Sequence, residues 1–92
     1  MVSSSRKSKK SVEITDRKKD GHYLILHNDD VNTFEYVIDT LCEVCKHNPE
    51  QAEQCAMITH YRGKCEIKKG SFSELKIIKD ALLERKLSVT ID

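Results

Sequence analysis

The chain has 92 residues, of which 16 are basic and 15 acidic, so its formal net charge is +1. This length fits one small domain, and one proline with three glycines is ordinary for a soluble globular protein rather than a fibrous one. The opening residues contain no apolar run long enough for a secretory signal or a membrane anchor. We therefore expect a cytoplasmic protein whose four cysteines are reduced.

Residues 1–19 are rich in serine and lysine and nearly free of large apolar side chains. Such a composition cannot offset the entropy cost of ordering, so we predict a flexible basic N-terminal extension before a core domain over 20–92. Residues 1–20 carry a net charge of +4 and the remainder −3. The basic stretch has no interleaved aromatic residues and the core has no basic stripe, which argues against nucleic-acid binding.

Residues 22–27 are β-forming and predict a buried strand that leads into Asn28, Asp29 and Asp30. By residue type alone, these three polar residues most simply form an Asx-type turn that caps the following helix. The two adjacent carboxylates have no basic residue beside them, so they can also attract a cation.

Two helices are expected after this loop, and the first of them is amphipathic. Asn32 is the expected N-cap of the first, with Glu35 completing a capping box. Its apolar positions follow helical spacing: Phe34, Val37, Ile38, Leu41, Cys42 and Cys45. Asn48 and Pro49 predict the start of the second helix, which should end near Gly63, so that His60 lies at its carboxyl end.

The rest of the chain predicts a strand over 63–69, a helix that opens with a capping box at 71–74, and a final strand over 87–91. The apolar stripe of this third helix comprises Leu75, Ile78 and Leu82, widened by Ile77 and Ala81. The order β-α-α-β-α-β predicts an α+β sandwich, with the helices packed on one face of a small, mainly antiparallel sheet.

A lone histidine near a helix end is more often a cap or a surface residue than a ligand. If His60 faces the acidic loop, however, its neutral imidazole, the carboxylate of Asp30 and the amide oxygen of Asn28 can together hold a primary ammonium group.

These motifs resemble the ClpS adaptors of the bacterial N-degron pathway, which pass proteins with particular first residues to a Clp AAA+ protease. The resemblance covers roughly residues 20–92. It rests on Asn28, Asp29 and Asp30 after a strand, on segments 34–37 and 60–64, and on the closing strand through Leu87 and Thr90.

The resemblance implies that Asn28, Asp30 and His60 bind the α-amino group of a client protein, while Asp29 shapes the loop. It also implies a pocket for the client's first side chain, lined by Leu26, Asn32, Phe34, Ala56, Thr59 and Leu87. Three of these depart from the usual family pattern: Phe34 replaces a methionine, Thr59 an aliphatic residue and Asn32 a threonine.

The resemblance further implies a non-enzymatic, cofactor-free monomer with no nucleic-acid or membrane partner. Its clients would begin with Phe, Tyr, Trp or Leu, and its partner would be the N-terminal domain of a Clp-type AAA+ unfoldase. Lys76 and Lys79 are candidates for the docking face, and the basic extension would engage the unfoldase pore.

Two other classes of function stay open. Cys42 and Cys45 have CxxC spacing, and Cys55, Cys65, His47 or His60 could complete a zinc or thiol site. Against this alternative, Cys42 and Cys45 fall on an apolar stripe and no second CxxC exists. Asp30 and His60 could also act as an acid-base pair, but the chain has no nucleophile or phosphate-binding motif beside them.

Overall fold

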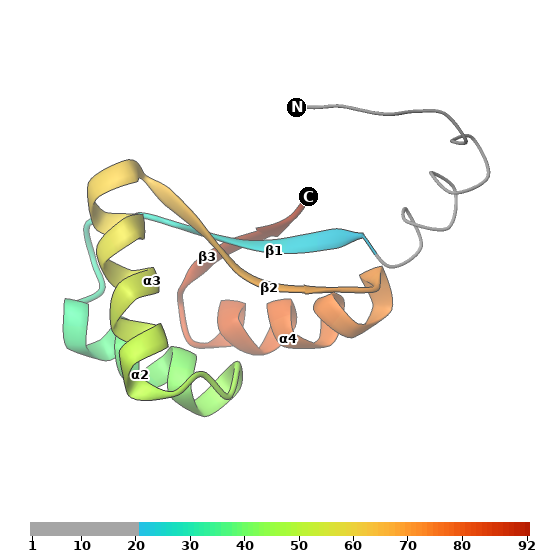
Figure 1. Ribbon diagram of the computed structural model, residues 1–92, viewed down its shortest axis with the longest axis horizontal. Helices are drawn as coiled ribbons and strands as arrows, with labels where there is room; N and C mark the ends of the chain where they lie inside the picture. Colours follow the sequence, from blue (N-terminus) through green and yellow to red (C-terminus); the bar gives the residue numbers. More distant parts are fainter. Residues whose placement is uncertain (1–20) are drawn as a thin grey trace.

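The computed structural model describes residues 21–92 (Figure 1). Its elements are β1 (His22–His27), α2 (Phe34–Val44), α3 (Pro49–Arg62), β2 (Lys64–Gly70), α4 (Phe72–Glu84) and β3 (Ser88–Ile91). This order confirms the predicted β-α-α-β-α-β arrangement, with the ends of β2 and β3 displaced by one residue. The predicted flexible extension over 1–19 lies outside the described residues. None of the helices described for residues 21–92 has the length and apolar character that a membrane span requires.

The three strands form one antiparallel sheet in the order β2-β1-β3, so β1 is the central strand. Leu26 lies opposite Cys65 on β2 and Val89 on β3. A bulge between Leu24 and Ile25 shifts the register of the pair with β2. Because β1 is paired on both sides, the loop that follows it leaves from the best-supported strand of the sheet.

The helices cover one face of this sheet, as predicted. Figure 1 shows α4 running beneath the strands, with α2 and α3 together at one end of the molecule. One hydrophobic cluster joins all six elements, and Leu24, Leu41 and Leu82 within it are fully buried. Such shared burial of apolar surface is the main stabilising contribution to a small domain.

The predicted cap of α2 is wrong by one residue. Thr33, not Asn32, is the N-cap, and its Oγ1 accepts a hydrogen bond from the Tyr36 backbone N–H at 3.1 Å. Glu35 therefore closes no capping box with Asn32. The physical reason is the orientation of the Asn32 carboxamide, which is fixed because its Nδ2 donates both to Asp29 Oδ2 and to the backbone oxygen of Lys86, each at 2.9 Å. Among residues 21–92, its Oδ1 accepts no hydrogen bond from the first turn of the helix.

The other helix ends confirm the predictions. Asn48 caps α3, its Oδ1 accepting from the Gln51 N–H at 2.8 Å, and Ser71 with Glu74 forms a complete capping box on α4. Gly63 ends α3 with a φ of 94°, a left-handed conformation that favours glycine. The apolar stripe of α4 is narrower than expected, because Ile77 is 73% exposed.

Candidate functional site

The loop after β1 is organised around Asp29. Its Oδ1 accepts hydrogen bonds from the backbone N–H groups of Val31 and Asn32, both at 2.8 Å, and its Oδ2 accepts from the Asn32 side chain at 2.9 Å. Partial burial acts to raise the pKa of Asp29, but the hydrogen bonds from Asn32 and Val31 outweigh it and hold the pKa below its ordinary value. Asp29 is thus an Asx-turn residue, and its carboxylate is occupied within the loop.

The same loop lies beside the end of α3. The backbone N–H of Asn28 donates to the Gly63 oxygen at 2.9 Å. His60 lies in the last turn of α3, and its ring packs edge-on against Tyr61 with the ring centroids 4.9 Å apart. The end of β1 and the end of α3 therefore form the two sides of one site.

An open cavity of about 610 Å³ lies between these segments. The polar part of its lining includes Asn28, Asp30 and His60, which the sequence places on two distant segments. Among residues 21–92, the side chains of Asp30 and His60 form neither an ion pair nor a hydrogen bond. The cavity therefore presents an amide, a carboxylate and an imidazole that are available to a cationic donor.

The remaining lining is mostly apolar. It includes Leu26, Phe34 and Ala56, together with Thr59. Thr59 is buried and donates its hydroxyl to the Cys55 backbone oxygen at 2.8 Å, so the hydroxyl does not need a ligand as its acceptor. A threonine can therefore stand in an otherwise apolar wall without leaving an unsatisfied donor.

Nine of the ten residues assigned from the sequence line the cavity, including Asp29 and Asn32, but Leu87 does not. Leu87 is 3% exposed and belongs to the core cluster. Four lining residues were not assigned from the sequence: His27, Val37, Met57 and Tyr61. The signal for three of them was helical spacing. Val37 lies one turn after Phe34 on α2, and Met57 lies one turn before both His60 and Tyr61 on α3.

The cysteines do not assemble the alternative site. Within 21–92, no group of three His, Cys, Asp or Glu side chains is placed to hold a metal ion. Burial raises the pKa of Cys45 to about 11 and, with the nearby Cys55 thiol, that of Cys65 to about 12. Burial also raises the pKa of Cys55. Because the thiolate is the metal ligand and the nucleophile, these neutral thiols favour packing over chemistry.

A family model described as ATP-dependent Clp protease adaptor protein ClpS matches residues 17–90. The chain belongs to the ClpS family. The resemblance inferred from the loop and from His60 is thereby confirmed, and the match covers all of the described core except its last two residues and includes every assigned site residue.

Curated ClpS relatives are named ATP-dependent Clp protease adapter protein ClpS. The one from Nitratidesulfovibrio vulgaris is 32% identical over 56 residues, which cover 59% of this chain and 56% of that protein. The one from Serratia proteamaculans is 35% identical over 57 residues, which cover 60% and 54% respectively. The alignments thus span little more than half the length of these relatives.

A solved structure with a similar fold is that of Agrobacterium tumefaciens ClpS2 bound to L-phenylalaninamide. The TM-score is 0.68, and the match covers 80% of this chain and 96% of that one at 20% identity. The likeness confirms the α+β fold of the ClpS core.

Proposed function

We propose that this ClpS-family chain is a non-enzymatic adaptor that binds the free amino-terminal residue of client proteins and delivers them to a Clp AAA+ unfoldase for degradation. The observation that carries the proposal is the cavity that sets Asn28, Asp30 and His60 beside apolar walls. The name of the relatives supports the adaptor role. Phenylalaninamide, the ligand of the A. tumefaciens protein, combines a free α-amine with an aromatic side chain, which are the two features that such a cavity suits.

In this proposal, the client's α-ammonium donates to the Asn28 amide oxygen, the Asp30 carboxylate and the His60 imidazole. The first side chain, Phe, Tyr, Trp or Leu, enters the part of the cavity lined by Leu26 and Ala56. A volume of about 610 Å³ lies within the range of ordinary ligand sites, which is roughly 300–1,000 Å³, and accommodates an aromatic ring. The monomeric state and the docking roles of Lys76 and Lys79 stay predictions.

The energetics require both parts of the site. Charge-assisted hydrogen bonds contribute about 1.5–3 kcal/mol each, and burying a large apolar side chain contributes a similar amount. Micromolar affinity needs about 8 kcal/mol after ordering costs are subtracted. Three amine contacts give about 4.5–9 kcal/mol before ordering costs, and the apolar pocket gives less. Once ordering costs are subtracted, neither part reaches about 8 kcal/mol alone, so recognition demands a free amine and a fitting side chain together.

The test of amine recognition is fluorescence anisotropy with a labelled peptide that begins with Phe, compared with the same peptide acetylated at its amino terminus. Acetylation removes the ammonium charge and two donors, so we expect affinity to fall about a hundredfold or more. His60→Ala should reduce the difference in affinity between the free and the acetylated peptide, whereas the exposed control Ile77→Ala should leave that difference unchanged. Equal affinity of the wild-type protein for both peptides would contradict the proposal.

Delivery is tested separately from binding. A client that begins with Phe should be degraded faster by a Clp unfoldase–protease in the presence of this chain and ATP, and the free Phe peptide should compete. If the chain binds the client but does not accelerate its degradation, the proposed amine site would stand and the proposed adaptor role would be wrong.

A further inference from the structure

Asn32 joins two segments that are far apart in the sequence. Its Nδ2 donates one hydrogen bond to Asp29 Oδ2 and another to the backbone oxygen of Lys86, each at 2.9 Å, while its backbone N–H donates to Asp29 Oδ1 at 2.8 Å. An amide nitrogen carries two hydrogens, so both are used. Although Asn32 lines the cavity, its side chain has no donor left for a ligand.

The acceptor at Lys86 belongs to a firmly held turn between α4 and β3. The N–H of Lys86 donates to Leu83 O at 3.0 Å, and that of Leu87 to Leu82 O at 3.1 Å. Lys86 has a φ of 70°, and the next side chain, Leu87, is buried in the core. The core thus determines where this carbonyl points.

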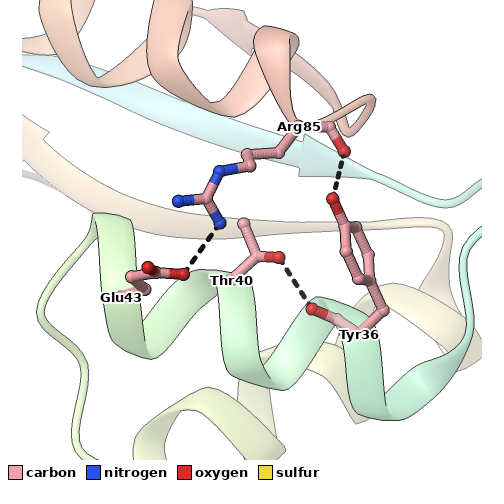
Figure 2. A network of polar contacts seen from close by, with 4 residues as sticks. All are labelled: Tyr36, Thr40, Glu43 and Arg85. Carbon is pink, nitrogen blue, oxygen red and sulfur yellow. Dashed lines mark hydrogen bonds and ion pairs between the residues drawn. The ribbon is translucent and has the colours of Figure 1, made fainter.

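A second set of contacts ties α2 to the same turn (Figure 2). The Tyr36 hydroxyl donates to the Arg85 backbone oxygen at 2.8 Å, and the Arg85 guanidinium pairs with Glu43 at 2.8 Å. Figure 2 shows Arg85 reaching both ends of this stretch of α2, with Thr40 between them bonded to the Tyr36 carbonyl. The turn therefore holds the helix that follows the loop as well as the loop itself.

We infer that Asn32 is a positioning residue for the amine-binding loop, which it aligns against the α4–β3 turn, and that it does not select the client's side chain. Asp29, the direct partner of Asn32, stands between Asn28 and Asp30 in the chain. A displacement of Asp29 would therefore move both of these amine contacts together. The inference rests on the proposed function.

The test is Asn32→Leu, which removes both donors at nearly constant volume. Affinity is measured for four peptides that begin with Phe, Tyr, Trp and Leu. Since all four share the α-amine, we expect each to bind about tenfold more weakly than to the wild-type protein, in an unchanged order of preference. Asn32→Ala, at the same half-buried position, should show the same uniform loss of affinity. It replaces the leucine variant in the test if that variant does not fold.

The matched control is Asn48→Leu. Asn48 likewise makes a structural hydrogen bond, as the cap of α3, but it is not in the cavity lining. Thermal unfolding should show a loss of stability for both variants, whereas only the Asn32 variants should lose affinity.

Three outcomes would overturn the inference: wild-type affinity of the Asn32 variants for all four peptides, a changed order of preference, or an equal loss in Asn48→Leu. A changed order would make Asn32 a wall of the side-chain pocket. Failure of the proposed function is distinguishable, because it appears in the wild-type protein as indifference to amino-terminal acetylation.

Discussion

At the scale of single residues, the polar groups around the cavity fall into two sets. Asp29, Asn32 and Thr59 are occupied by hydrogen bonds within the protein. Asp30 and His60 have no side-chain partner among residues 21–92. Two neighbouring aspartates thus have different surroundings, since the carboxylate of Asp29 is bonded within the turn whereas that of Asp30 lines the cavity without a partner in the described chain.

Asp29→Asn tests the structural role of that first carboxylate. In the variant, one of the two accepting oxygens becomes an N–H₂ donor, which then faces either Asn32 Nδ2 or the two backbone N–H groups, all of them donors as well. We therefore expect the free energy of unfolding at pH 7 to fall by about 1 kcal/mol. The pKa of Asp29 is depressed in the folded state, so its carboxylate stabilises the folded protein at pH values above the unfolded-state pKa of about 3.9. This stabilisation is lost as the pH falls through the pKa of Asp29 in the folded protein.

Urea unfolding of both proteins from pH 7 down to pH 3 measures this difference. The stabilities of wild type and Asp29→Asn should converge as the pH falls below about 4, because protonation removes the charge that distinguishes them. A constant difference across this range would show that the carboxylate charge contributes nothing to the turn.

At the level of secondary structure, the start of α2 shows how one of two neighbouring residues becomes the N-cap. Asn32 and Thr33 are both acceptable N-caps, and the spacing to Glu35 favoured Asn32. The distant Lys86 carbonyl engages Asn32, and Thr33 then caps the helix. A contact between distant segments overrides the local signal.

Thr33→Ala should therefore destabilise the domain by about 1 kcal/mol, because it leaves the Tyr36 N–H without its acceptor. For a domain of this size, the expected fall in melting temperature is roughly 4–8 °C by circular dichroism. Thr33→Ser keeps the hydroxyl and should stay close to wild type. A serine variant as unstable as the alanine variant would mean that the threonine methyl group, not the cap, stabilises the helix.

At the scale of the whole molecule, the site and the core share the same strand. Leu24 and Leu26 of β1 lie in the cluster that joins all six elements, and the loop starts where β1 ends. Leu26 also lines the cavity. The geometry of the cavity therefore depends directly on the packing of the domain.

Leu24→Ala should lower the unfolding free energy by about 2–5 kcal/mol, since Leu24 is fully buried and its neighbours on both strands limit collapse of the resulting cavity. The exposed Ile77 provides the comparison, as Ile77→Ala should change stability by no more than about 0.5 kcal/mol. Urea denaturation measures both. Similar losses in the two variants would contradict the assignment of the core.

Patterns in the amino-acid sequence were sufficient to predict the element order, the caps of α3 and α4 and the family, because these depend on local periodicity, on short-range hydrogen bonding and on motifs that stay together in the chain. Three features became apparent only in the three-dimensional structure: the acidic loop and His60 line one cavity, Asn32 bonds to Lys86, and Leu87 belongs to the core instead of the cavity lining. Each of these depends on contacts between distant segments, which the packing of the helices and the sheet brings together and no local pattern specifies.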